Sequence, residues 1–243
     1  MIEQYQNYTA QLPYTYAFGH FTAETMLHGR PHLAQQLVLH PQIAPSWATR
    51  LHAAAKAAGT PVTTDEALIT RLRKKASVHA VLVLRKETDV LGPAAPHVVL
   101  AGISQYGNFG TIMRTAVAFG FHDVALVASP LEEWNPHALR ASVGLRAQLR
   151  VTSYPTLAQY RAAHPVHHPL LLAATHAQGL HETPRPAEPF SVVFGPEWPA
   201  SEALATELAG LPATRVRIAQ APAAESLNVA SAAAIVLHQW RGL

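Results

Sequence analysis

The chain contains no cysteine, and this absence excludes disulfides, zinc–thiolate sites and cysteine nucleophiles. It also lacks any apolar run near the ~20 residues that a membrane-spanning helix needs. The first residues, Met1 to Gln4, do not have the pattern of a signal peptide. We therefore expect a soluble, cytoplasmic protein with no membrane partner. The net charge of +3 is small, so it allows a nucleic-acid partner without requiring one.

The usual spacings of metal-binding histidines are also missing. The chain has fifteen histidines, but no His-Glu-x-x-His segment occurs. His167 and His168 stand between two prolines, an arrangement that is typical of a loop. The sequence therefore predicts surface histidines there and no metal site.

Short apolar runs alternate with helical patterns through residues 91–243. This alternation predicts an α/β domain with a mostly parallel sheet covered by helices. The strand candidates are Val98–Ile103, Val124–Val127, Leu149–Val151, Leu170–Ala174, Phe190–Phe194 and Val216–Ile218. Asn135 and Pro136 form a good cap and first-turn pair for one of the helices.

Residues 1–90 predict a smaller domain of αβα type, followed by a linker at Lys86–His97 that is rich in proline and glycine. Its predicted elements are strands at Leu37–Leu39, Val62 and Ala80–Leu84, a helix at Ser46–Ala58, and a second helix after a capping box at Thr63–Glu66. The sequence thus divides into domains of residues 1–90 and 91–243.

A first polar segment follows the predicted strand at His97–Ile103. Gly107, Asn108 and Gly110 are expected in the turn between this strand and the next helix, with Arg114 about one turn into that helix. An arginine there could present its guanidinium group to an anion or a hydroxyl oxygen. The alternative is an ordinary surface arginine on an amphipathic helix.

Two further segments also place polar residues directly after a predicted strand or at the start of a predicted helix. The strand Phe190–Phe194 ends in a tight turn at Gly195-Pro196-Glu197, where Glu197 is either a site carboxylate or a solvated one. Ser226 and Asn228 begin a helix whose apolar residues recur at helical spacing, and they serve either as a simple N-cap or as ligand contacts. Because ligands bind parallel sheets at the carboxyl ends of the strands, we expect the three segments to share one site.

Together these segments resemble the SpoU (TrmH) family of RNA ribose methyltransferases in the SPOUT superfamily. Asn108-Phe109-Gly110 with Arg114-Thr115-Ala116 is similar to the first family motif, Gly195-Pro196-Glu197 to the second, and Ser226–Val229 to the third. Leu139–Gly144 also resembles an Arg-Ala-Ser-x-Gly segment of the family. The chain departs from the pattern at Gln105-Tyr106, where Asp-Pro is common, and at Trp198-Pro199-Ala200, where a glycine is usual. Pro199 removes a backbone donor from the second-motif loop.

The resemblance implies an S-adenosylmethionine-dependent RNA 2′-O-methyltransferase. It implies a SPOUT fold with a C-terminal trefoil knot, a homodimer, and an RNA substrate, which we expect to be rRNA more than tRNA. Catalytic roles carry over to Arg114, Asn108, Glu197, Ser226 and Asn228. Cofactor-binding roles carry over to Phe194, Gly195, Glu197, Ile218 and Leu227.

A basic cluster is expected to bind the RNA backbone. It comprises Arg71, Arg73, Lys74 and Lys75 at the end of a predicted helix, and we add Arg140 to it as an RNA-binding residue. The alternative is that these cations only complement the negative end of the helix dipole.

Two other function classes remain open at this point. One is a non-catalytic RNA-binding protein of the same fold, which the altered second motif would allow. The other is a nucleotide-dependent oxidoreductase that uses the Gly107–Gly110 turn. The absence of Gly-x-Gly-x-x-Gly and of an acidic residue after Val127 disfavours the oxidoreductase.

Overall fold

The computed structural model describes residues 5–73, 75–172, 177–196, 201–221, 223–224 and 226–241. It divides into two compact units, which are described separately. The first comprises Met1–Glu87 with Trp134–Gln148, and the second comprises Thr88–Glu133 with Leu149–Leu243. The sequence predicted a single division at residue 90. The structure places one boundary near that point and adds the segment Trp134–Gln148 to the first unit.

The first unit is a four-stranded sheet with helices on both faces. Its strands are, in spatial order, β1 (Tyr14–Phe18), β4 (Ala80–Arg85), β2 (Ala34–Leu39) and β3 (Val62–Thr64). Its helices up to residue 87 are α1 (His20–Gly29), η2 (Pro31–Leu33), α2 (Pro45–Ala57) and α3 (Glu66–Leu72). Leucines and alanines of α1 and α2 pack on one face, and Leu68, Ile69 and Leu72 of α3 pack on the other. β1 and α1 were not predicted.

The segment Trp134–Gln148 packs against the first unit through specific contacts. It contains α5 (Pro136–Ala141), which is capped by Asn135 as predicted, and η3 (Leu145–Gln148). Thr15 Oγ1 donates a hydrogen bond of 2.5 Å to the carbonyl oxygen of Trp134. Gly144 has a φ of +80°, and a Cβ there would lie 2.7 Å from the carbonyl oxygen of Thr22. The Leu139–Gly144 segment, which resembles the Arg-Ala-Ser-x-Gly segment, therefore holds α5 against the elements α1 and β1.

The second unit contains a seven-stranded sheet in which every described strand pair is parallel, as predicted. Its strands are, in spatial order, β7 (Arg150–Tyr154), β6 (Asp123–Val127), β5 (His97–Ala101), β10 (Phe190–Phe194), β8 (His168–Leu172), β11 (Thr214–Arg217) and β9 (Gln178–Gly179). The two-residue β9 was not predicted.

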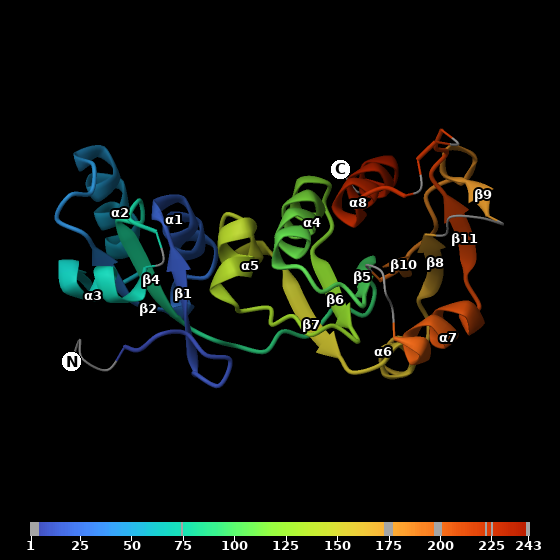
Figure 1. Ribbon diagram of the computed structural model, residues 1–243, viewed down its shortest axis with the longest axis horizontal. Coiled ribbons are helices and arrows are strands. Elements are labelled where there is room, and N and C mark those ends of the chain that lie inside the picture. The colour runs from blue at the N-terminus through green and yellow to red at the C-terminus, as the bar shows by residue number, and fades with distance from the viewer. Residues whose placement is uncertain are drawn as a thin grey trace. The chain divides into compact units, whose positions relative to one another are not determined.

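Helices cover both faces of this sheet (Figure 1). On one face lie α4 (Tyr106–Ala118) and α8 (Val229–Gln239), which pack against each other. On the other lie α6 (Leu157–Ala163) and α7 (Glu202–Gly210), whose leucines join the buried side chains of the central strands. A short η4 (Leu180–Glu182) follows β9. No helix in the described part of the chain is long and apolar enough to span a membrane.

Candidate functional site at the carboxyl ends of β5 and β10

The first polar segment is more helical than predicted. α4 begins at Tyr106, so Gly107, Asn108 and Gly110 lie inside its first turns, and the prediction of a turn at these residues was wrong. The chain reverses earlier, at Gly102, where φ is +70°. Glycine adopts this conformation at little cost. The chain can therefore turn sharply at Gly102, and α4 begins a short distance further on, at Tyr106.

Gly102 also brings two strand ends together. A Cβ at this position would lie 2.8 Å from Cβ of Pro196 and 2.7 Å from a methyl group of Leu204. β5 and β10 are parallel neighbours, with Leu100 opposite Phe194. The segments after these two strands therefore meet at one edge of the sheet, as the strand-end rule predicts. Gly102 lies inside the strand predicted at Val98–Ile103, whereas β5 ends at Ala101, so the sequence pattern did not single it out.

The third segment joins the first through a pair of asparagines. Asn228 is the N-cap of α8, and its Oδ1 accepts hydrogen bonds from the backbone N–H groups of Ala230 (2.9 Å) and Ser231 (3.3 Å). Its Nδ2 donates to Oδ1 of Asn108 at 3.1 Å. Asn228 is thus both the N-cap and the partner of a first-motif residue 120 positions away. Ser226, expected at the start of the helix, is exposed and lies two residues before the cap.

The predicted cofactor residues lie around this edge of the sheet. Phe194 is the buried last residue of β10. At Gly195, which follows it, a Cβ would have no heavy atom within 4 Å among the described residues beyond its chain neighbours. Ile218 follows β11, and Leu227 precedes the N-cap with 36% of its surface exposed. Glu197 and the altered Trp198-Pro199-Ala200 stretch lie outside the described residues.

Arg114 lies on the exposed surface of α4. Because the helix begins at Tyr106, Arg114 is about two turns into it, and not one turn as predicted. Six residues of helix separate it from Asn108, a rise of roughly 9 Å. At 3.6 residues per turn, the same spacing also turns the two side chains roughly 120° apart around the helix axis.

Part of the basic cluster surrounds a cavity in the first unit. Arg71, in the last turn of α3, donates a hydrogen bond from Nη2 to the carbonyl oxygen of Tyr5 at 2.8 Å. Arg73 donates from Nη1 to Ala76 O at 2.8 Å and Val78 O at 3.2 Å. Both line a cavity of about 530 Å³ to which α5 contributes Arg140. The other lining residues are Asn7, Tyr8, Tyr16, Phe18, Leu72, Val78, Asn135, Pro136 and His137. Lys75 is exposed, and Lys74 lies outside the described residues.

The prediction of surface histidines fails at one of the two positions. His168 is exposed, but His167 is only 2% exposed and lies beside the buried His97 and His164. The sequence analysis missed this cluster. Its local signal is the spacing His164-x-x-His167, but His97 is far away along the chain, so the spacing alone could not reveal the group.

Known proteins similar to this chain have been found by sequence and by structure. The model of the SpoU rRNA methylase family matches residues 95–238. An uncharacterized tRNA/rRNA methyltransferase of Synechocystis sp. is 32% identical over 155 residues, which cover 59% of this chain and 52% of that protein. The 23S rRNA (adenosine(1067)-2'-O)-methyltransferase of Streptomyces laurentii is 34% identical over 146 residues, covering 58% and 52% respectively. The chain therefore spans about half the length of these curated relatives.

The structural comparison extends over both units. The AdoMet-bound rRNA methyltransferase from Sinorhizobium meliloti matches with a TM-score of 0.75 at 20% identity, and the match covers 93% of this chain and 86% of that one. At this identity the match establishes a shared fold. The family model, by contrast, covers more than half of the chain and includes all three motif segments. The chain therefore belongs to the SpoU rRNA methylase family.

Proposed function

We propose that this protein transfers a methyl group from S-adenosylmethionine to a ribose 2′-hydroxyl of a structured RNA, ribosomal RNA in preference to transfer RNA. The observation that carries the proposal is the hydrogen bond between Asn228 and Asn108, which joins the third and first motifs of a SpoU family member at one edge of the sheet. The similar Streptomyces laurentii protein is named as a 2'-O-methyltransferase of 23S rRNA, and the Sinorhizobium meliloti structure contains AdoMet.

The residues at the strand ends fit the cofactor. Open space at Gly195 lets a ligand approach the backbone closely. Leu227 and Ile218 offer apolar surface for a nucleoside, and backbone groups around Gly195 would fix its polar edge. When bound, S-adenosylmethionine supplies a methyl group on a cationic sulfur. The role of these residues is to hold it there, since correct positioning can supply up to ~7–11 kcal/mol of a barrier reduction.

The polar residues would orient the RNA ribose. Asn228 Oδ1 is committed to two backbone N–H groups, so its Nδ2 faces Asn108 and fixes the rotation of the Asn108 amide. Arg114 would contact the target ribose or its phosphate and polarise the hydroxyl. Because a guanidinium group stays protonated in proteins, we assign it electrostatic activation and assign proton acceptance to phosphate or water. Glu197 and Ser226 complete the proposed catalytic set.

The cationic cavity of the first unit supports RNA binding. Arg71, Arg73 and Arg140 come from two separate helical segments and line one concavity together with aromatic side chains. Arginines with aromatic rings are the residues that bind phosphates and stack on unpaired bases. The proposal also includes a homodimer, a C-terminal trefoil knot and a cytoplasmic location, which rest on the family resemblance and on the sequence pattern.

Calorimetry with candidate ligands tests the cofactor assignment. We expect S-adenosylmethionine and its demethylated product to bind, and nicotinamide dinucleotides not to bind, since the chain lacks their glycine-rich fingerprint. No heat with either sulfur ligand at millimolar concentration would favour a non-catalytic RNA-binding protein. Mapping of ribose methylation in total RNA, with and without the gene, then identifies the substrate.

The asparagine pair can be tested separately from the helix cap. Asn228→Asp keeps an oxygen that caps α8 but replaces the donor to Asn108 with a charged acceptor. We expect methyl transfer to fall by up to about tenfold, since a neutral hydrogen bond contributes about 0.5–1.5 kcal/mol and 1.4 kcal/mol corresponds to tenfold. Thermal stability should be nearly unchanged. Asn228→Ala, which loses both functions, is expected to lower stability by about 1 kcal/mol as well. Equal activity of the Asn228→Asp variant and the wild type would remove this pair from the proposed site.

A further inference from the structure

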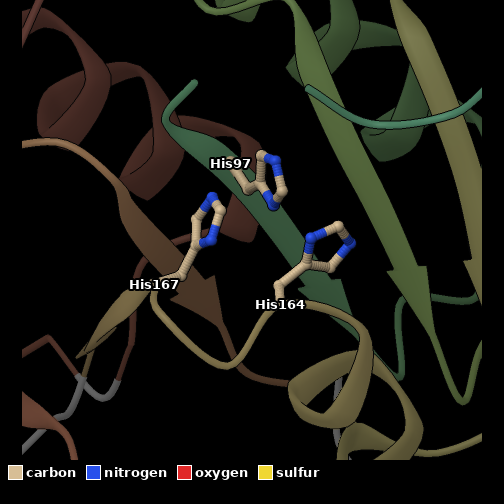
Figure 2. A group of neighbouring side chains, drawn as sticks. All are labelled: His97, His164 and His167. Carbon is tan, nitrogen blue, oxygen red and sulfur yellow. The ribbon is translucent and has the colours of Figure 1, made fainter. Parts of the chain in front are cut away.

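Three buried histidines meet at the opposite edge of the large sheet from the motif site. His97 is the first residue of β5, His164 directly follows α6, and His167 directly precedes β8 (Figure 2). Since the strands of this sheet are parallel, the amino ends of β5 and β8 share one edge. Figure 2 shows the three rings turned toward one another. Their exposed fractions are 0%, 8% and 2%.

The ring nitrogens are close enough to share one ion. One nitrogen from each ring lies within 4.8 Å of the nitrogens of the other two. The ring centroid of His97 is 4.0 Å from that of His167 and 4.6 Å from that of His164. A tetrahedral zinc ion with Zn–N bonds of about 2.0–2.1 Å holds its ligand nitrogens roughly 3.3 Å apart. The rings of His97 and His167 are stacked, with 27° between their planes, so these rings must rotate for their nitrogens to bind one ion.

Backbone carbonyls fix the protonation of two of the rings. His97 Nε2 is 2.9 Å from Gly92 O, and His167 Nε2 is 3.0 Å from Ala95 O. A carbonyl oxygen only accepts, so each Nε2 carries the hydrogen and each Nδ1 carries a lone pair. Metal-binding histidines characteristically donate the second ring N–H to a carbonyl or carboxylate in this way.

One of these lone pairs has no partner in the described part of the chain. Nδ1 of His167 is buried and accepts no hydrogen bond from the residues that the structure describes. Nδ1 of His97 accepts from the hydroxyl of Tyr160 at 2.9 Å, and this hydroxyl also contacts Ser191 Oγ at 2.5 Å, so Tyr160 keeps a partner if His97 turns to an ion. A buried polar atom without a partner is rare and requires an explanation, and an ion is one of the few available.

The third ring can complete the set. His164 Nε2 is 2.8 Å from the hydroxyl of Tyr154, which can accept its hydrogen and leave the other nitrogen for a ligand bond. Burial lowers the pKa of His97 to about 4, and burial is also the main cause that lowers the pKa of His164 and of His167. Burial therefore favours the neutral form of each ring, and neutral imidazole is the form that binds metals.

We propose that His97, His164 and His167 form a binding site for one divalent transition-metal ion, with zinc the best match to three imidazole ligands and no thiolate. The ion would tie the segment before β5 to the loop between α6 and β8. Because the cluster lies at the sheet edge opposite the motifs, its role is to stabilise the fold.

Zinc titration of tag-free, chelator-treated protein tests this site without any activity assay. We expect one zinc ion per chain by calorimetry, and a rise in Tm of roughly 5–10 °C when free zinc exceeds the Kd a hundredfold. Cobalt(II) in place of zinc should give the visible absorption of a four-coordinate site in which a water molecule completes the three imidazole ligands. Absence of zinc binding at micromolar concentration would overturn the proposal.

Variants locate the bound ion. His167→Asn and His164→Gln should each weaken zinc binding by at least ~100-fold and abolish the cobalt absorption. His168→Asn, a change at the exposed neighbouring histidine, should leave both unchanged. If His167→Asn does not fold, His164→Gln and the cobalt spectrum of the wild type still decide the outcome. One zinc ion that persists in both ligand variants would lie elsewhere and contradict the assignment.

Discussion

Replacing Arg114 by alanine is expected to slow methyl transfer by about 100- to 1000-fold and to leave the affinity for S-adenosylmethionine within a few-fold. The magnitude is that of removing one preorganised group which stabilises charge developing in a transition state. Arg114 lies on α4, whereas the proposed cofactor residues follow β10 and β11 or precede α8. Loss of its guanidinium group should therefore affect the reacting ribose and not the cofactor.

Single-turnover methyl transfer to the mapped RNA measures the first effect, and calorimetry measures the second. Arg241→Ala is the matched control, because Arg241 is an exposed arginine of the same unit that lies beyond the far end of α8 from Asn228. Arg114→Lys keeps the charge but loses the planar fork of donors, and we expect it to recover only part of the rate. If Arg114→Ala kept most of the wild-type turnover, the role assigned to this arginine would be wrong.

The large sheet could be predicted because most of its strands have a recognisable apolar pattern in the local sequence. Runs such as Val124–Val127 and Val192–Phe194 are apolar at every position, as strands buried on both faces require. Every strand predicted after residue 90 overlaps an observed one. β9 was missed because two residues, Gln178 and Gly179, carry no periodic pattern.

The composition of the first unit could not be predicted, because it depends on contacts that are distant in sequence. Thr15 and Trp134 are joined by a hydrogen bond across 119 positions. Within α5, the cap at Asn135 is a local signal and was predicted correctly. The surface that receives this helix, on α1 and β1, has no signature in the α5 sequence itself.

The meeting of the motif segments could be predicted from the sequence, whereas the roles of the site residues stay predictions. The order of the motifs indicated that Asn108 and Asn228 belong together, and the structure joins them by a hydrogen bond. The position of Arg114 was misjudged, because the start of α4 depends on the reversal at Gly102. The histidine cluster was missed because His97 reaches His164 and His167 only after β5 and β8 have joined one sheet.

The second large effect is expected in RNA binding. The triple variant Arg71→Gln, Arg73→Gln and Arg140→Gln should weaken RNA affinity about 100-fold at low salt, since hydrogen bonds to charged groups contribute on the order of 1–3 kcal/mol each before solvent screening. The three arginines line one cavity of about 530 Å³. A guanidinium group has five N–H donors, so the bonds of Arg71 and Arg73 to backbone carbonyls leave donors for phosphate.

Salt dependence separates phosphate binding from helix capping. Each lost phosphate contact reduces the slope of log affinity against log salt by roughly one unit, so the triple variant should lose about two to three units. Glutamine retains an amide donor for the backbone carbonyls, and thermal unfolding checks that the variant folds. The control is the pair Arg50→Ala and Lys56→Ala on α2, which packs on the opposite face of the small sheet from α3. An unchanged slope in a folded triple variant would show that Arg71 and Arg73 only complement the end of α3, and RNA recognition would then lie on another surface.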